Sequence, residues 1–323
     1  PSGGLGDVYK RQGGFHPSFG QPDDVIEFRP KRLGARCADN DAPALQIRVP
    51  PAEVFGLFAH RQWRAGMLMA DALFTGAFDV RDRAVIELGA GTALPSLTAA
   101  ICGGARCVAA TDYDNDTLLA ALRHNTRRNL ESNGAHAPFV AMGQTWGHSC
   151  EDVLDWLPRS SARYDAVLLA DCMWDQFSHD DLLKTVSSLL ARTSEARVYV
   201  VSGFHTGRGK VVHFLRRAAR VGLRLVPLGH EELWPPLTGN PEPVEDAESP
   251  LHRSSELVLE LEMGGELDES VSTQVDGASY LTGVRRPFAP ERTVPDTTGK
   301  PIEEPVQERN RWLSVFAMGW SNL

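Results

Sequence analysis

The stretch Ala84–Thr92, with the sequence Ala-Val-Ile-Glu-Leu-Gly-Ala-Gly-Thr, constrains the fold of this chain more than any other segment. An apolar run ends in the acid Glu87 and then in a Gly-x-Gly turn, which is the pattern of a buried strand that enters a tight loop. Gly89 and Gly91 can adopt positive φ and lack the Cβ atoms that would keep a ligand away from the backbone. The run Leu94–Ile101 predicts a helix whose first amide groups face that loop.

The glycine loop alone leaves the ligand open. The dinucleotide fingerprint G-x-G-x-x-G requires a third glycine, whereas Leu94 stands at that position. An oxidoreductase that uses a nicotinamide dinucleotide is therefore disfavoured. A tight turn without any ligand also remains an alternative for a Gly-x-Gly pattern considered by itself.

A second strand-like run, Arg106–Tyr113, points to a nucleoside ligand. Asp112 lies near the end of this run, about 20 residues past the glycine loop, where an acid can hold ribose hydroxyls. A carboxylate can accept from both hydroxyls of one ribose, and Tyr113 can pack beside an adenine ring. Asp112 could instead cap the next helix, but Asp114 and Asn115 are better placed to do so.

Short apolar runs alternate with helical patterns between Arg83 and Val201, which indicates βαβ units and a parallel α/β sheet. The last run, Trp312–Trp320, is expected to be an antiparallel strand beside the strand near residue 225. Helical spacing also recurs within Ala52–Ala72. The other expected elements are helices from about Asn115 to Leu130 and from His179 to Leu190, and strands at Tyr164–Asp171, Val198–Val201 and Leu223–Leu228.

We divide the chain into an irregular N-terminal arm, residues 1–50, and one domain, residues 51–323. Residues 1–12 are Gly-rich and patternless, so we expect a non-native, vector-derived origin and exclude them from fold reasoning. Residues 235–305 are rich in Pro and Glu. We interpret them as an insertion that is partly ordered at most, with one strand-like run at Glu256–Glu262.

Composition excludes several classes of protein. A hydrophobic fraction of 42% and a charged fraction of 23% are typical of a soluble globular protein. A net charge of −9 argues against a nucleic-acid partner. The five cysteines include no C-x-x-C pair, so we expect no disulfide framework, no bound metal and a cytoplasmic location. No apolar run reaches the roughly 18 residues that a membrane span needs.

Three further positions, combined with the glycine loop and Asp112, make the sequence resemble a known family. Trp63 lies upstream of the first strand, Trp146 precedes a glycine, and Ala170 ends a strand that continues as Asp171-Cys172-Met173-Trp174. With the glycine loop and Asp112, this ordered set resembles the family 16 methyltransferases. These are seven-strand enzymes that use S-adenosylmethionine (AdoMet) and include many protein-lysine methyltransferases. The likeness is greatest to a fungal branch labelled nicotinamide N-methyltransferase-like, which includes the elongation factor 1-alpha N-terminal and lysine methyltransferase.

This resemblance covers about residues 55–230 and the final strand. It implies a Rossmann-like class I fold with a mostly parallel seven-stranded sheet, helices on both faces and AdoMet as cofactor. Glu87 is expected to orient the glycine loop or to meet the ammonium group of the cofactor. The family's cofactor contacts correspond here to Trp63, Gly89, Ala90, Gly91, Asp112, Trp146 and Ala170. We add Tyr113 to the expected cofactor-binding residues, because it directly follows Asp112. Thr92-Ala93 and the 235–305 segment depart from the family pattern.

The resemblance also implies the acceptor: a protein lysine or N-terminal amine that receives the methyl group in line, with a translation factor as the candidate protein substrate. We expect Asp171, Trp174 and Phe204 to line the acceptor channel, with Phe177 nearby, although Asp171 could instead cap the helix that follows. Two alternatives remain open: a small nicotinamide-like amine as acceptor, and an AdoMet-binding scaffold without activity. We expect a monomer.

Overall fold

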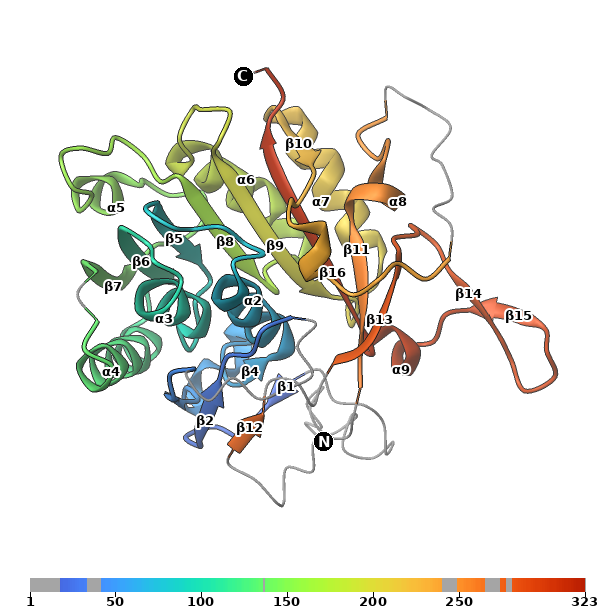
Figure 1. Cartoon of the computed structure of the whole chain (residues 1–323), viewed down its shortest axis with the longest axis horizontal. Helices are drawn as coiled ribbons and strands as arrows, with labels where there is room; N and C mark the ends of the chain where they lie inside the picture. The colour runs from blue at the N-terminus through green and yellow to red at the C-terminus, as the bar shows by residue number, and fades with distance from the viewer. Residues whose placement is uncertain are drawn as a thin grey trace.

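A twisted central sheet with helices on both faces forms the body of the protein in the computed structural model (Figure 1). The structure describes residues 18–33, 42–135, 137–239, 249–264, 274–276 and 281–322. Residues 1–12, which we expected to be non-native, lie outside this part of the chain. The α/β class and the mostly parallel sheet agree with the sequence prediction.

Five neighbouring strands of the sheet are parallel, in the order β7-β6-β5-β8-β9. Their side chains alternate between two apolar cores: in β5, Val85 faces one core and Ile86 the other. A strand buried on both faces needs a nearly continuous apolar sequence, which explains the apolar runs. The bounds are β5 (Ala84–Leu88), β6 (Cys107–Asp112), β7 (Phe139–Gly143), β8 (Ala166–Ala170) and β9 (Arg197–Gly203).

The helices that connect these strands divide between the two faces. Helices α2, α3 and α4 bury apolar residues in one core, and α5, α6 and α7 in the other. Within the described residues, no helix is long and apolar enough to cross a membrane. The bounds are α2 (Arg64–Thr75), α3 (Leu94–Ile101), α4 (Asp116–Ser132), α5 (Glu151–Asp155), α6 (His179–Leu189) and α7 (Gly209–Arg220).

The long last strand β16 (Trp312–Trp320) runs antiparallel to β9. On its other edge, the half from Ala317 to Trp320 pairs antiparallel with β10 (Leu223–Val226). The predicted position and direction of the last strand are therefore confirmed. These strands complete the seven that the family likeness implied.

Residues 235–305, which we interpreted as an insertion partly ordered at most, add two strands to this sheet. Strand β11 (Leu259–Met263) pairs antiparallel with the remaining edge of β16, and β13 (Leu281–Pro287) pairs with β11. The sheet therefore has nine strands. The strand-like run at Glu256–Glu262 corresponds to β11, whereas β13, with the sequence LTGVRRP, has no apolar alternation to predict it. Residues 240–248, 265–273 and 277–280 of this segment lie outside the described residues.

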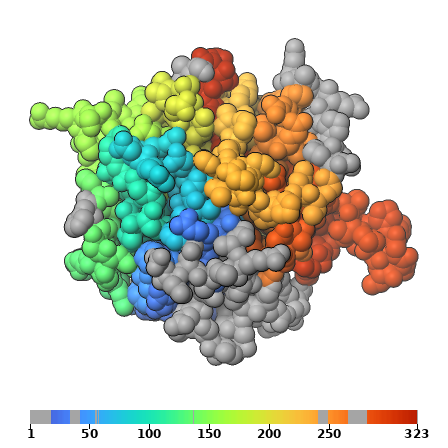
Figure 2. All heavy atoms as spheres, in the orientation of Figure 1, coloured from blue at the N-terminus to red at the C-terminus, as the bar shows by residue number. Residues whose placement is uncertain are grey.

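Several smaller elements complete the C-terminal half. A hairpin of β14 and β15 projects from the surface, at the right of Figure 2. The remaining bounds in the C-terminal half are η2 (Gln176–Ser178), η3 (Glu231–Leu233), α8 (Ser254–Leu257), β14 (Thr293–Pro295), β15 (Pro301–Glu303) and α9 (Val306–Arg309).

The N-terminal arm is more regular than the sequence indicated. Strands β2 (Val25–Arg29) and β3 (Leu45–Arg48) pair antiparallel, and β12 (Gln274–Asp276) adds to β2 in parallel. The alternating burial of β2 and β3 explains this pairing, because Phe28 and Ile47 enter the same core as α4. The arm is thus packed on the domain in the region that the structure describes.

The helix expected within Ala52–Ala72 begins only at Arg64. The preceding residues form a 3-10 segment, η1 (Ala52–Leu57), a turn at Phe58 with φ +55°, and the short strand β4 (Gln62–Trp63). Strand β4 pairs with β1 (Ser18–Phe19). Because this break replaces a helical turn, it directs the side chains of the 58–63 segment toward the carboxyl ends of the central strands.

Candidate active site

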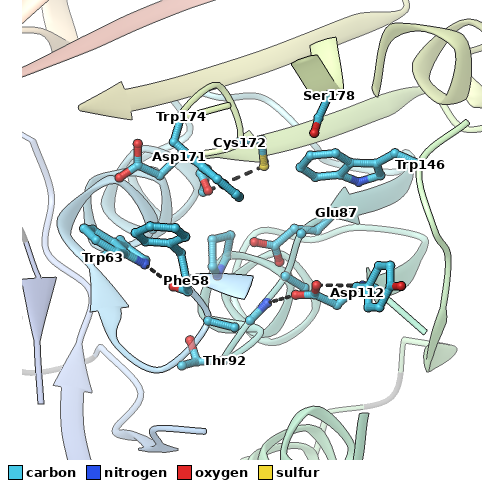
Figure 3. A pocket seen from close by; sticks show the side chains of 18 of the residues that line it. Phe58, Trp63, Glu87, Thr92, Asp112, Trp146, Asp171, Cys172, Trp174 and Ser178 are labelled. Atoms are coloured by element: carbon cyan, nitrogen blue, oxygen red, sulfur yellow. Dashed lines mark hydrogen bonds between the residues drawn. The ribbon is translucent and has the colours of Figure 1, made fainter. Parts of the chain in front are cut away.

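A cavity of about 410 Å³ opens at the carboxyl ends of β5 to β9 (Figure 3). The 58–66 segment and the start of α6 also contribute to its walls. Parallel α/β sheets place their ligands at this edge, and the volume lies in the range of small-molecule sites. The cofactor and acceptor residues predicted from the sequence line this cavity, apart from Phe204 and Phe177. These are Trp63, Glu87, Gly89, Ala90, Gly91, Asp112, Tyr113, Trp146, Ala170, Asp171 and Trp174.

The glycine loop adopts the positive φ that its sequence indicates, +71° at Gly89 and +50° at Gly91. A Cβ atom on Gly89 would lie 3.1 Å from the sulfur of Cys172 and 3.2 Å from the ring of Trp146. The indole of Trp146 therefore packs directly on the loop backbone. Any side chain at residue 89 would fill the space between the loop and this ring, so the cradle requires glycine.

Asp112 fixes the glycine loop through its carboxylate. Its Oδ2 accepts a hydrogen bond from the amide of Gly91 at 2.6 Å, and its Oδ1 accepts from the amide of Tyr113 at 2.7 Å. Burial raises the pKa of this carboxyl to about 6. Asn115 caps α4 instead, accepting from the amide of Leu118 at 3.1 Å. The carboxylate retains lone pairs that can accept from ribose hydroxyls.

Glu87 is a buried acid at the end of β5. Its Oε2 accepts from the amide of Ser96 at 2.9 Å and from the Ser96 hydroxyl, which ties the strand to the first turn of α3. Burial raises the pKa of Glu87 to about 8, against the opposing effect of these hydrogen bonds. A buried carboxyl that lines a pocket favours a cationic ligand, because the cation compensates the cost of ionisation.

Aromatic side chains gather at the opposite end of the cavity (Figure 3). The indole N–H of Trp63 donates to the carbonyl of Phe58 at 2.7 Å, and the rings of Phe58 and Trp174 lie 4.6 Å apart. The other face of this group is a stack between Trp63 and His205, with ring centroids 5.1 Å apart and planes within 14°. These rings enclose a space suited to an amine, since aromatic faces attract cations and exclude water.

Asp171 lies beside these rings in a left-handed conformation, with φ +59°. Its Oδ1 accepts from the hydroxyl of Ser202 and from the amide of Gly203, each at 3.1 Å. It does not cap the helix that follows; the next short helix, η2, is capped by Asp175. The structure therefore fixes Asp171 by contacts to β9, across the sheet, and leaves its Oδ2 toward His205.

Two expected neighbours of the acceptor channel lie elsewhere. Phe204 is fully buried, packs on Phe288 with centroids 6.2 Å apart, and lies under the guanidinium of Arg208. Phe177 is 85% exposed and does not line the cavity. The assignment of Phe204 to the channel is wrong, because the chain leaving β9 turns Phe204 into the core and the next residue, His205, into the pocket.

Some pocket residues were not predicted from the sequence. Phe58 had been placed on the apolar face of a helix, and His205 was overlooked although it follows a strand end. Gln62 was also missed: its Oε1 accepts from the hydroxyl of Thr92 and links the 58–66 segment to the glycine loop. Only the position of His205 carried a signal, since polar residues just past the carboxyl ends of parallel strands are site candidates.

The residues present fit AdoMet. The loop cradle under Trp146 can hold the amino-acid part with Glu87 near its ammonium group, and Asp112 can hold the ribose. Fold and site together define an AdoMet-dependent methyltransferase. The model of the family described as lysine methyltransferase matches residues 44–219, more than half of the chain. The chain belongs to this lysine methyltransferase family.

Two similar curated proteins have the same name. The chain is 31% identical to the protein N-terminal and lysine N-methyltransferase EFM7 of Eremothecium gossypii, over 70% of this chain and 89% of the relative. It is 27% identical to EFM7 of Kluyveromyces lactis, over 60% of this chain and 78% of that protein. Among solved structures, TYW2 of M. jannaschii in complex with AdoMet is 14% identical with a TM-score of 0.37, over 64% and 77% of the two chains.

Proposed function

We infer that this chain transfers the methyl group of AdoMet to an amine of a protein, either a lysine side chain or an N-terminal α-amine. The observation that carries this inference is the aromatic and acidic end of the cavity, formed by Phe58, Trp63, Trp174 and Asp171, directly beside the cofactor end. The EFM7 names support it, since they describe lysine and N-terminal methylation.

The protein mainly binds the cofactor and the amine, aligns them, and excludes water from the site. AdoMet supplies the methyl group on a sulfonium, ready for in-line displacement. The glycine loop, Glu87 and Asp112 hold the cofactor. Trp63, which the family likeness gave as a cofactor contact, lies at the aromatic end and with Trp174 directs the amine toward the cofactor. The aromatic walls exclude water, which favours the neutral, nucleophilic form of the amine. The same walls stabilise the cationic product.

Asp171→Asn tests the acceptor end. We expect turnover to fall by about 10²-fold, because the carboxylate orients the pocket around the reacting amine, with AdoMet affinity within about 2-fold of the wild type. Single-turnover transfer and calorimetric AdoMet binding measure the two effects. Asp180→Asn, an exposed acid on α6, is the matched control and should change neither. If Asp171→Asn kept both turnover and affinity, the proposed role would be wrong.

The acceptor class is tested by incubating the protein with tritiated AdoMet and a fungal lysate, and then separating proteins from small molecules. Label in a protein band supports the proposal. Label only in the low-mass fraction would indicate a nicotinamide-like acceptor instead. AdoMet binding without transfer to either fraction would indicate a scaffold.

The finer assignments are also proposals. We propose a translation factor as substrate, with purified elongation factor 1-alpha as the first protein to assay. We further propose that the enzyme acts as a cytoplasmic monomer. Light scattering after size exclusion tests the oligomeric state, and a fluorescent fusion tests the location.

A further inference from the structure

His205 occupies a position in the pocket that the cofactor site does not explain. It follows β9 in the loop that leads to α7 and stacks on Trp63 at the aromatic end. Its side chain is only 9% exposed, and its Nδ1 makes no hydrogen bond within the described residues. Nδ1 lies 4.0 Å from Oδ2 of Asp171. At this distance the carboxylate can form an ion pair with the imidazole ring once the ring accepts a proton.

The backbone is shaped around this pair. A Cβ atom on Gly203 would lie 2.8 Å from Nδ1 of His205 and 3.7 Å from Oδ2 of Asp171, and so would intrude on their contact. Gly203 also donates its amide to the other oxygen of Asp171. Glycine at residue 203 thus permits the approach of the imidazole to the carboxylate, while Trp63 fixes the plane of the ring.

The loop that carries His205 is held from the far side by a buried ion cluster. Arg208 donates to both oxygens of Glu260 in β11 and to Glu304, at 2.9 Å from Nη2 to Glu260 and 2.7 Å from Nε to Glu304. The recess behind His205 is lined by Arg64 and by residues before and within β16, including Asn310. The ionisable side chains that line this recess with His205 are Asp171, just past β8, and Arg64 from α2.

Two other acids of the pocket already have hydrogen-bond partners. Glu87 is bound to Ser96, and both oxygens of Asp112 accept from loop amides. Asp181 lies against Gly147 beside Trp146, and His148 is exposed. Of the two histidines that line the pocket, His205 is the one that stacks on Trp63 at the aromatic end.

We propose that His205 is the proton acceptor for the methyl-accepting amine, oriented by Asp171. This proposal rests on the proposed function. A lysine or N-terminal amine arrives as an ammonium ion and must lose one proton before its lone pair can attack. Nε2 of His205 takes that proton, and the resulting imidazolium donates from Nδ1 to Asp171. The nitrogen–carbon bond then forms as the carbon–sulfur bond of the cofactor breaks, and the proton passes from His205 to solvent.

The test is the pH profile of His205→Gln with purified elongation factor 1-alpha as acceptor. We expect single-turnover transfer to fall by about 10²–10⁴-fold near neutral pH. The loss should shrink as the pH rises toward the usual lysine pKa of about 10, because the amine then loses its proton to water. A loss of the same size at every pH would show a positioning role only and would overturn the proposal, as would an unchanged rate.

Gly203→Ala provides a variant that retains the imidazole. Its Cβ should displace the ring from Asp171 and give a smaller loss with the same dependence on pH. Gly209→Ala is the matched control, because a Cβ there meets no atom within 4 Å and φ is not positive. An unchanged profile in Gly203→Ala would count against the contribution of Asp171.

A readout independent of turnover uses the NMR signal of the His205 Cε1–H group, with n-butylamine as a lysine side-chain analogue. We expect the signal to shift on titration in the wild type and less in Gly203→Ala; no shift in the wild type would contradict contact between amine and imidazole. AdoMet affinity monitors folding in each variant. Failure of the wild type to methylate any protein would defeat the proposed function, whereas methylation with an unchanged His205→Gln profile would defeat this proposal alone.

Discussion

Glu87 shows most directly how one buried residue can couple the cofactor site to pH. Its pKa is raised from 4.5 to about 8 by burial, so the folded, ligand-free protein holds this carboxyl mainly protonated near neutral pH. The raised pKa means that Glu87 contributes stability at low pH, and this contribution is lost as the pH rises from 4.5 through about 8.

A cationic ligand reverses this preference, which gives a prediction for AdoMet. Binding should ionise Glu87 and release up to one proton near neutral pH, and affinity should rise with pH until about 8. Calorimetry in buffers of different ionisation enthalpy measures the released protons. Glu87→Gln should abolish the release. A wild type that releases no proton would show that Glu87 does not meet the charged part of the cofactor.

Residue-scale prediction came closest to the structure where the backbone conformation is local. Gly89 has the positive φ that a tight loop after a strand requires, and Asp112, predicted as the acid at the end of the next strand that can hold ribose hydroxyls, lies against this loop. Phe204 and His205 differ by one position, and which of them faces the pocket depends on the path of the chain as it leaves β9. Sequence spacing does not specify that path, so Phe204 was assigned to the channel in error.

Helix α4 contributes an unusual connection at the scale of elements. Asn129 accepts from the amide of Gln46 at 2.7 Å and donates to its carbonyl at 2.9 Å, and Asn125 makes the same pair of bonds with Arg48. Asn125 also donates to the carbonyl of Thr92, at the end of the glycine loop. Two side chains four residues apart on a helix thus replace a partner strand for β3.

We predict that Asn129→Ala lowers the free energy of unfolding by about 2 kcal/mol, because both main-chain groups of Gln46 lose their partners. Urea denaturation measures the loss. The matched control is Arg127→Ala on the exposed face of the same helix, which should stay within about 0.5 kcal/mol of the wild type. Equal stability of the two variants would contradict the structural role of Asn129.

Elements with a strong period were predicted closely: α3 has the predicted bounds, Leu94–Ile101, and β16 has the predicted bounds and neighbour. The helix expected within Ala52–Ala72 was predicted too long. Apolar residues recur there at helical spacing, but Phe58 and Trp63 contact the pocket rather than the core. A hydrophobic pattern cannot distinguish burial in a core from the lining of a binding site.

At the scale of the whole molecule, the buried ion cluster of Arg208, Glu260 and Glu304 connects the C-terminal segment to the methyltransferase domain. Arg208 precedes α7, whereas Glu260 and Glu304 come from the segment that we interpreted as an insertion. Burial opposes ionisation of Glu304, but hydrogen bonds and the charges of Arg208 and Arg286 outweigh it and hold its pKa below the usual value. This stabilisation is present above the usual pKa of Glu304, 4.5, and is lost as the pH falls below it.

Glu304→Ala should therefore destabilise the fold by about 3 kcal/mol, since it leaves part of the Arg208 guanidinium buried without a partner. The neighbouring Glu303→Ala, whose carboxylate is 88% exposed, should have almost no effect. Thermal unfolding compares the two. Equal melting temperatures would mean that the C-terminal segment contributes little to the stability of the domain.

The sequence by itself determined the parallel sheet, the glycine loop and the acids that follow the strands, because these depend on local backbone conformation and on burial along single elements. Tertiary structure decided the acceptor end. His205, Asp171 and Trp63 are separated in the sequence. They meet because β8 and β9 are neighbours in the sheet and the 58–66 segment packs against the ends of these strands. Tertiary structure also decided that β11 and β13 extend the sheet. The sequence indicated a strand at Glu256–Glu262, but its pairing depends on the free edge of β16, and β13 has no pattern of its own.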